Sequence, residues 1–271
     1  MNKQKAPGAI EWWKEWSPEL AYILGFAFAD GGIGKGRNGL VIGQSKRDIL
    51  DQIASVAPNP RIVYSEGAKV WRLTFCEPGL NTILAGYGIV PNKTVLGFWP
   101  PSMPHDLVQH YLRGFFDGDG CISIRKKGYG GTVSFVCHSS SYLQAVKDHF
   151  NLLDVSDGSM LKDGRNYRLR YHSADSLKRI YALFYTDASL YHRGKFRRFE
   201  DLLHKYASSP SGGGRARGEQ VPTAKLTDEQ VLEIRLAHNL TGEREAFALT
   251  LGVSNQVIDA ALDYKTWRHL P

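Results

Sequence analysis

The chain has 271 residues, 42% of them hydrophobic and 11% aromatic, which is enough to bury a core in one large domain or two modest ones. No apolar run is long enough to span a bilayer, and the N-terminus contains no apolar signal-peptide core, so we expect an intracellular, soluble protein with no membrane partner. Three cysteines without a CxxC pair fit reduced thiols, and a net charge of +7 favours an anionic partner, most commonly nucleic acid.

The first strongly patterned segment, residues 17–32, predicts a helix that follows an N-terminal extension of residues 1–16. Ser17 suits the N-cap of this helix and Pro18 suits its first turn, while paired glycines end it. The aromatic residues of the extension are expected to pack on the main domain rather than stack on bases. Hydrophobic patterning then predicts a strand, a helix and a strand at 39–45, 47–56 and 69–75.

The same order of elements recurs from residue 105. A helix is predicted over 105–120, followed by a hairpin over 121–139 that turns at glycines, a helix over 141–153 and a strand over 167–173. The chain therefore predicts an α+β fold made of two αββαββα halves related by a pseudo-twofold axis. We expect these halves to span residues 17–104 and 105–206.

The last part of the chain differs in composition from both halves. Residues 207–224 are rich in Ser, Gly and Pro and lack periodicity, which predicts a flexible linker. Beyond the linker, residues 225–240 predict a helix whose N-terminus carries a capping box, formed by Thr227 and Gln230.

The segment from Ala248 to Ile258 has the pattern A-x3-G-V-S-x3-I, which is typical of a helix-turn-helix. Gly252 is expected to form the turn and Ser254 to cap the second helix. Residues 225–271 are thus predicted to form a small all-α module. Asn255 and Gln256 begin its second helix and are candidates for DNA base contact; a packing module with no DNA role is the alternative.

Each predicted half opens on a helix that ends in an aspartate, Asp30 in the first and Asp119 in the second. Small residues recur four positions apart before each aspartate, at Gly25 and Ala29 and at Gly114 and Gly118. Such faces let two helix backbones approach closely. A carboxylate is disfavoured at the negative end of a helix, and two side by side repel each other. A divalent cation such as Mg2+ relieves that repulsion, whereas either Asp-Gly pair alone would suit an ordinary turn.

The segments ILGFAFADG (23–31) and LRGFFDGDG (112–120) resemble two copies of the LAGLIDADG motif of homing endonucleases. The resemblance implies that the last acid of each copy, Asp30 and Asp119, binds catalytic metal together with the backbone of Ala29 and Gly118. It implies Mg2+ as cofactor, and we expect Mn2+ or Ca2+ to substitute for it in binding. The first copy has Phe28 in place of an earlier acid, whereas the second keeps Asp117, which is expected to be a capping or structural residue.

The resemblance further implies a single-chain enzyme whose two curved antiparallel sheets lie in the major groove of double-stranded DNA. The enzyme would act as a monomer and make a double-strand break in a long, non-palindromic target. Gln44, Lys93 and Lys195 resemble the family's glutamine and lysines around metal-bound water, so we take them as catalytic candidates. The counterpart of Gln44 in the second half is Cys137 or His138, and a solvated surface charge is the alternative for each lysine.

Polar and basic side chains alternate with apolar ones on the predicted strands, which suits contact with base edges in the major groove and equally suits an ordinary solvent-exposed face. A basic cluster also lies near a predicted hairpin tip. The candidates for DNA contact are Arg72, Thr74, Arg168, Arg170 and His172 on the strands and Arg125 and Lys126 at the tip.

Two other functions fit the same resemblance. One is a non-catalytic transcriptional regulator that combines a LAGLIDADG domain with a helix-turn-helix, and the other is an RNA maturase. The presence of both motif aspartates and both lysines favours cleavage over regulation. The helix-turn-helix favours DNA over RNA.

Overall fold

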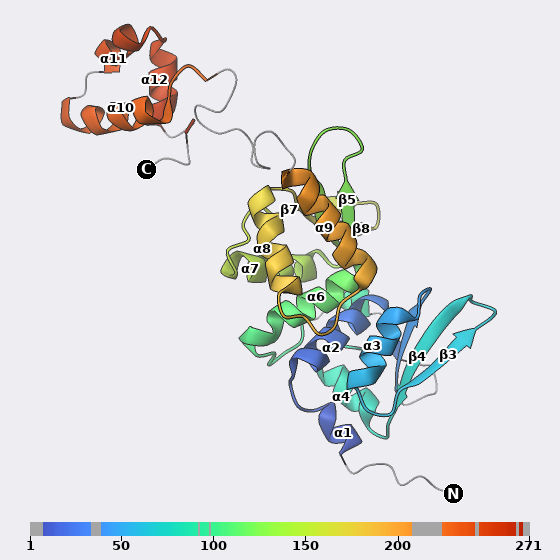
Figure 1. Cartoon of the computed structure of the whole chain (residues 1–271). Helices are drawn as coiled ribbons and strands as arrows, with labels where there is room; N and C mark the ends of the chain where they lie inside the picture. The colour runs from blue at the N-terminus through green and yellow to red at the C-terminus, as the bar shows by residue number, and fades with distance from the viewer. Residues whose placement is uncertain are drawn as a thin grey trace, which may run out of the picture. The chain divides into compact units, whose positions relative to one another are not determined.

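The structure is a computed structural model that describes residues 8–33, 39–91, 93–97, 99–207, 224–241, 244–263 and 266–267. The chain divides into two compact units, Met1–Tyr206 and Ala207–Pro271 (Figure 1). We call them the N-terminal unit and the C-terminal unit and describe each by itself. The predicted linker lies outside the described residues except for its two ends.

The first half of the N-terminal unit follows a short helix, α1 (Ala9–Trp12). Its elements in chain order are α2 (Pro18–Asp30), β1 (Gly31–Ile33), β2 (Gly39–Gln44), α3 (Asp48–Val56), β3 (Arg61–Ser65), β4 (Val70–Cys76) and α4 (Leu80–Gly86), with α5 (Lys93–Leu96) after them. The four strands form one antiparallel sheet in the order β1-β2-β4-β3.

The second half repeats this plan after a 3-10 turn, η1 (His105–Leu107). Its elements are α6 (Val108–Asp119), β5 (Cys121–Ile124), β6 (Gly131–Cys137), α7 (Ser140–Leu152), β7 (Ser159–Asp163), β8 (Asn166–Tyr171) and α8 (Ala174–Tyr185). Its antiparallel sheet has the matching order β5-β6-β8-β7. The predicted α+β fold of two αββαββα halves is therefore confirmed.

A further helix, α9 (Arg193–Ala207), follows the second half and was not predicted as a separate element. It buries Phe199 and Leu202, and Phe196 packs beside them. The spacing of these apolar residues is helical. It was missed because this segment was interpreted only as the continuation of the half.

Helices α2 and α6 lie side by side in the middle of the N-terminal unit and pack along their length (Figure 1). A Cβ atom added to Gly25 would lie 2.0 Å from the carbonyl oxygen of Tyr111, and one added to Gly114 would lie 2.0 Å from the carbonyl oxygen of Tyr22. The predicted small-residue faces therefore do form the interface between the halves. Neither glycine can gain a side chain unless the two backbones separate.

The glycines after the two motif aspartates have extended backbones instead of the left-handed conformation common at helix ends, with φ of −92° at Gly31 and −73° at Gly120. Each helix therefore ends where a strand starts, with no intervening loop at Gly31 and only Gly120 between α6 and β5. Glycine is required by space: an added Cβ would lie 2.6 Å from Ala27 Cα in the first case and 2.1 Å from the ring of Phe116 in the second.

Both sheets turn one face toward the core that surrounds α2 and α6. The buried hydrophobic strand residues include Leu40, Ile42, Leu73 and Phe75 in the first sheet and Val133, Phe135, Leu169 and Tyr171 in the second. Trp13 of the N-terminal extension is fully buried, with its ring edge-on to Phe75 at 5.1 Å between centroids. The aromatic residues of the extension thus pack on the main domain, as predicted.

The described part of the C-terminal unit has three helices, α10 (Asp228–Thr241), α11 (Arg244–Leu251) and α12 (Asn255–Leu262), around a small core of its own. The predicted capping box is confirmed: Thr227 N donates to Gln230 Oε1 at 2.8 Å, and Gln230 N donates to Thr227 Oγ1 at 3.1 Å. Gly252 turns the chain with a φ of 65°. Ser254 stands at the N-cap of α12, but its side chain makes no capping hydrogen bond there, which corrects the prediction of a side-chain cap.

Replacing Thr227 with alanine is expected to lower the free energy of unfolding of the C-terminal unit by about 1 kcal/mol, because the first turn of α10 loses an acceptor. The measurement is thermal unfolding of the full chain followed by circular dichroism. Thr250→Ala is the matched control: the Thr250 hydroxyl donates to the carbonyl of Ala246 within α11, and alanine is the better helix former. Equal destabilisation by both variants would contradict the role assigned to the capping box.

Candidate metal centre and nucleic-acid interface

Asp30 and Asp119 come together because α2 and α6 end side by side. A Cβ atom added to Gly118 would lie 2.2 Å from Ala29 Cβ and 3.5 Å from Asp30 Oδ2, so the last turn of one helix faces the last turn of the other. Asp30 also raises the pKa of the Asp119 carboxyl through its charge. The structure thus brings the two predicted acids into one site.

Burial, followed by the charge of Asp30, raises the pKa of Asp119 to about 6, against the opposing effect of Lys195 and Lys93. A partly buried carboxylate beside a second carboxylate is costly to ionise. A proton or a divalent cation relieves that cost. The two acids therefore fit a hard cation with oxygen ligands, such as Mg2+. Within the described ranges no group of three or more His, Cys, Asp or Glu side chains gathers around a common point, so other ligands would come from backbone, water or substrate.

The surroundings of the two acids differ. Gln44 Nε2 donates a hydrogen bond to Asp30 Oδ2 at 2.6 Å. Gln44 ends β2 opposite Trp71, and Cys137 ends β6 opposite Tyr167, so the sheet registers make Cys137 the counterpart of Gln44. Cys137 is buried, and burial raises the pKa of its thiol. One acid thus has an amide neighbour where the other half has a thiol.

The side chains of both candidate lysines reach the ends of the two central helices. Lys93 is only 8% exposed and its Nζ donates to the carbonyl of Gly31 at 2.5 Å. Lys195 Nζ donates to the carbonyls of Phe116 and Gly118, at 2.6 and 2.8 Å. Burial lowers the pKa of both lysines, while the charges of Asp30 and Asp119 act in the opposite sense. Neither lysine is an ordinary solvated surface charge.

The predicted backbone ligands lie in the last turns of the two helices, at Ala29 in α2 and Gly118 in α6. The Gly118 carbonyl accepts from Lys195. A carbonyl oxygen has two lone pairs, so a cation at Gly118 would share this oxygen with the ammonium group.

Asp117 is 2% exposed, and its Oδ2 accepts hydrogen bonds from the Tyr22 hydroxyl at 2.8 Å and from the backbone N–H of His192 at 2.7 Å. Burial raises its pKa, and these hydrogen bonds oppose the rise. Its position fits the predicted structural role. Phe28, at the matching position of the first half, stacks on Tyr142 with ring centroids 4.2 Å apart.

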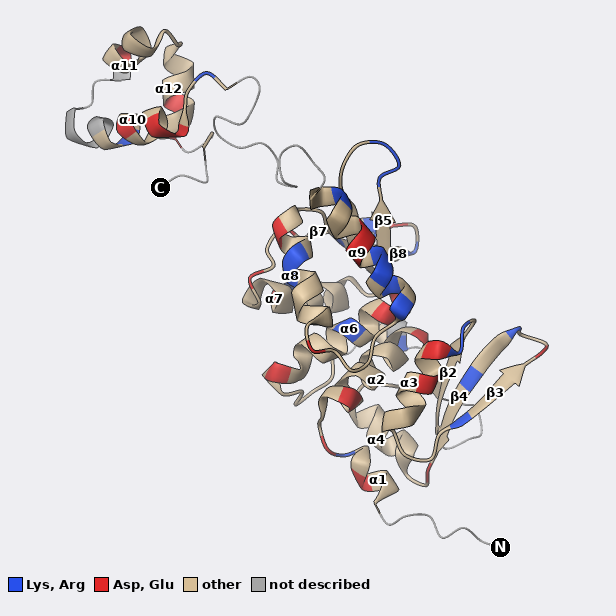
Figure 2. Ribbon diagram, in the orientation of Figure 1, with Lys and Arg blue, Asp and Glu red and all other residues tan. Residues whose placement is uncertain are grey.

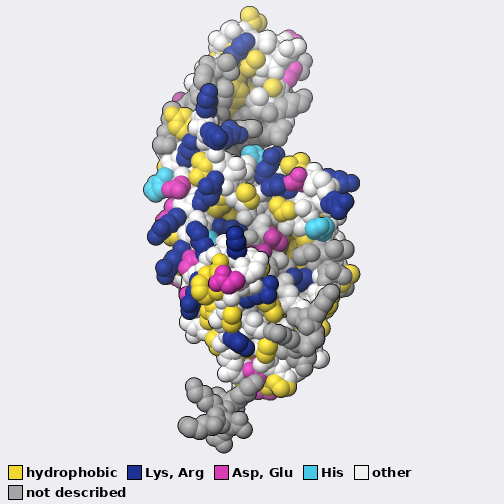
Figure 3. All heavy atoms as spheres, turned by 90° about the vertical axis from the view of Figure 1, so that its right-hand side faces the viewer, with side chains coloured by type: hydrophobic (Ala, Val, Ile, Leu, Met, Phe, Trp, Pro, Cys, Tyr) yellow, Lys and Arg dark blue, Asp and Glu magenta, His cyan; other side chains and the backbone are white. Residues whose placement is uncertain are grey.

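The outer face of the first sheet carries Arg72 and Thr74 on β4, next to Val63 of β3, which is 47% exposed. Figure 2 shows basic residues on these two strands and in the loop after β5, where Arg125 and Lys126 are exposed. The face of the N-terminal unit seen in Figure 3 carries more Lys and Arg than Asp and Glu.

The outer face of the second sheet is organised differently. Arg168 forms two hydrogen bonds to Asp163 Oδ2, at 3.0 and 2.6 Å, and a third to Ser134 Oγ at 3.1 Å. Arg170 follows on the same face, and its Nε is buried with no hydrogen-bond partner among the described residues. His172 comes directly after β8, with Nδ1 3.8 Å from Asp157 Oδ2.

Sequence reasoning missed two apolar positions on these faces. Val63 lies opposite Arg72, and Leu161, which is 41% exposed, lies opposite Arg168. Each arginine directly precedes a buried leucine of the middle strand, so the two pairs occupy equivalent places in the halves. Neither Val63 nor Leu161 has a buried neighbour on its own strand, so the strand pattern contained no signal for them. Arginine beside an apolar side chain suits contact with guanine and with the thymine methyl group.

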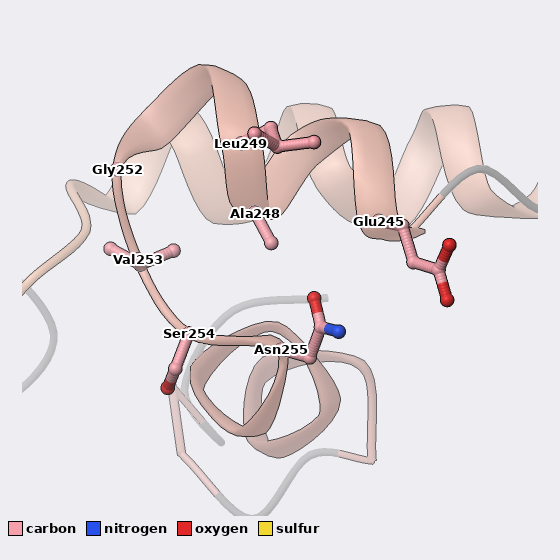
Figure 4. Close-up of a pocket in the computed structure, with 7 residues that line it drawn as sticks. All are labelled: Glu245, Ala248, Leu249, Gly252, Val253, Ser254 and Asn255. Atoms are coloured by element: carbon pink, nitrogen blue, oxygen red, sulfur yellow. The ribbon is translucent and has the colours of Figure 1, made fainter.

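In the C-terminal unit, Asn255 and Gln256 are both exposed at the start of α12. Figure 4 shows a hollow at the turn between α11 and α12, and the Asn255 side chain points into it toward α11. Gln256 does not line this hollow. The two candidates therefore face different surroundings.

Taken together, the structure has a duplicated α+β unit with two carboxylates at its central helix ends. Residues 106–185 match the family described as the LAGLIDADG-like domain, which confirms the resemblance over that part of the second half. None of the curated proteins matches the sequence. No helix among the described residues is long and apolar enough to cross a membrane.

Three solved structures are similar to this chain at low sequence identity. The LAGLIDADG meganuclease I-AabMI bound to uncleaved DNA is 14% identical, with 70% of this chain and 90% of that chain covered and a TM-score of 0.48. The meganuclease I-LtrWI bound to target DNA is 12% identical, with 72% and 94% covered and a TM-score of 0.49. Full-length DUF199/WhiA from Thermatoga maritima is 12% identical, with 92% and 90% covered and a TM-score of 0.47.

Proposed function

We propose that this chain is a divalent-metal-dependent DNA endonuclease that makes a site-specific double-strand break in a long, non-palindromic duplex. The observation that carries the proposal is the pairing of Asp30 and Asp119 at adjacent helix ends, where burial and mutual repulsion raise the pKa of Asp119. Two carboxylates that repel each other in the free protein suit a divalent cation, which would supply Lewis-acid chemistry at a phosphodiester.

The residues around this pair have distinct roles in the proposal. Asp30 and Asp119 would hold Mg2+, which would supply Lewis-acid activation of the phosphodiester and of water. Gln44 holds one carboxylate oxygen of Asp30 through its hydrogen bond. Lys93 and Lys195 place positive charge beside the acids, where charge develops on the phosphate oxygens. The sheet faces with Arg72 and Arg168, and the C-terminal unit, bind the duplex.

The test is incubation of the purified full chain and Mg2+ with a library of random duplex DNA, followed by sequencing of the cut ends. We expect cleavage at one long site, with both strands cut. A parallel capture experiment in Ca2+ selects bound sequences without requiring cleavage. Binding and cleavage selections that recover the same site support the proposal, and a complete lack of cutting at a tightly bound site contradicts it.

A DNA-binding regulator is the second candidate, and the helical C-terminal unit, with its turn at Gly252 between α11 and α12, is the observation that favours it. A regulator needs no carboxylate pair, so its binding would be insensitive to removal of either acid. The capture experiment described above separates the two candidates. Sequence-specific capture without cutting at any Mg2+ concentration supports the regulator.

A further inference from the structure

The buried carboxylate of Asp117 links three parts of the N-terminal unit. A single oxygen, Oδ2, accepts from the Tyr22 hydroxyl of α2 and from the backbone N–H of His192, which lies just before α9. Asp117 itself belongs to α6. Through these two hydrogen bonds the carboxylate holds the start of α9 against helices α2 and α6.

His192 in turn organises the first turn of α9. Its carbonyl accepts from the N–H groups of Lys195 and Phe196, at 2.9 and 3.0 Å. Its ring Nδ1 accepts from the N–H groups of Gly194 and Lys195, at 3.1 and 3.3 Å. These are the N–H groups that a helix start leaves without intrahelical partners. The backbone of Lys195 is thus placed by His192, and His192 is placed by Asp117.

The side chain of Lys195 returns from this turn to the helix that holds Asp117. Its Nζ donates to the carbonyls of Phe116 and Gly118, the two residues that flank Asp117 in sequence. The contacts form a closed loop from Asp117 through His192 and Lys195 back to α6. Loss of the Asp117 contact therefore frees the backbone from which the lysine reaches the site.

Among the described residues of the first half, no matching loop of contacts is formed. Phe28 stands in place of the acid and packs on an aromatic ring, and Lys93 lies on the four-residue helix α5 and donates to the carbonyl of Gly31. Only one of the two lysines is held by a buried carboxylate. A substitution at Asp117 should therefore affect Lys195 and not Lys93, whereas a general loss of packing would affect both lysines.

We propose that Asp117 is a positioning residue for Lys195, and so governs cleavage of only one of the two DNA strands. The inference rests on the proposed endonuclease function. Asp117 is only 2% exposed and its Oδ2 already accepts from Tyr22 and His192, so we assign its action to the His192 turn and not to metal binding. The amide oxygen of asparagine can accept both hydrogen bonds, whereas alanine accepts neither.

The first experiment measures nicking of each strand of the target separately, with the two 5′ ends carrying different labels. Asp117→Ala is expected to lower the nicking rate of one strand by about 100-fold, the loss typical of a misplaced catalytic group. The affected strand is expected to be the one whose nicking Lys195→Met also slows. Asp117→Asn is expected to cut both strands at close to the wild-type rates. Tyr22→Phe, which removes the other bond to the same oxygen but keeps His192, is expected to show no strand bias.

The second experiment needs no metal, DNA or cleavage. Each lysine's rate of acylation by acetic anhydride is measured by mass spectrometry in the free, folded chain. Asp117→Ala is expected to raise the rate at Lys195 several-fold and to leave Lys93 unchanged. Asp117→Asn keeps both hydrogen bonds but removes the charge that opposes the lowering of the Lys195 pKa by burial, so it is expected to raise the rate at Lys195 by clearly less than Asp117→Ala does. The inference would be overturned if Asp117→Ala slowed the nicking of both strands equally, or if Asp117→Asn were inactive. It would also be overturned if the acylation rate of Lys195 were unchanged in folded Asp117→Ala. If the wild-type chain cuts no DNA, the endonuclease proposal fails, and the acylation result alone decides whether Asp117 holds Lys195.

Discussion

Replacement of either Asp30 or Asp119 with asparagine is expected to abolish double-strand cleavage while duplex binding stays close to that of the wild type. Asparagine keeps the size of the side chain but removes the charge that holds a cation. Because both acids lie at one centre, loss of either affects the whole site. We expect the cleavage rate to fall by about 1000-fold or more, at least the loss seen when one electrostatic contact to a transition state is removed.

The measurement is single-turnover cleavage of the selected target in Mg2+, with binding followed in Ca2+. Asp154→Asn is the matched control, because Asp154 is exposed and pairs only with Arg179, at 3.6 Å, among its described salt bridges. Asparagine also tolerates the left-handed backbone of that position, where φ is 59°. Unimpaired cleavage by both site variants would refute the assignment of these acids.

Substitution of Gly114 by alanine is expected to destabilise the N-terminal unit by about 3 kcal/mol or more, at the upper end of the cost of overpacking a core. The new Cβ would lie 2.0 Å from the carbonyl oxygen of Tyr22 and 2.8 Å from the amide nitrogen of Phe26. Both are backbone atoms of α2, so no side-chain rotation relieves the clash. The helices must separate, and the carboxylates at their ends must move with them.

Urea denaturation of the full chain, followed by tryptophan fluorescence, measures this effect. Gly86→Ala is the control, since Gly86 ends α4 with nothing within 4 Å of an added Cβ. Alanine is the better helix former, so this change is expected to alter the free energy of unfolding by less than about 1 kcal/mol. If Gly114→Ala is as stable as the control, the close approach of α2 and α6 is wrong.

Local patterns were sufficient to predict the duplicated fold and the pairing of the two acids. Helix caps, the alternation of the strands and the small faces around Gly25 and Gly114 are all properties of short segments. The repeat then related the two segments to each other. Because the acids directly follow these faces, their closeness followed from the predicted helix packing.

Other features depend on contacts between separate elements of the fold, which local patterns cannot predict. The choice of Cys137 over His138 as the counterpart of Gln44 needed the register of β6 against β8. The burial of Lys195 needed the position of α9, and the ion pair of Arg168 with Asp163 needed the β7–β8 hairpin. The strand pattern made Arg168 a candidate for DNA contact but gave no sign that its guanidinium pairs with Asp163.

The direct passage from helix to strand after each acid has a consequence for retargeting such a protein. Asp30 ends α2 and β1 begins at the next residue, while a single glycine separates Asp119 from β5. No flexible segment separates either acid from the edge strand that follows it, β1 or β5. On the proposed function, redesign of β1 or β5 for a new target sequence will therefore shift the acids as well, and altered specificity will come with altered rate unless the changes are confined to strands that do not adjoin the acids, such as β4 and β8.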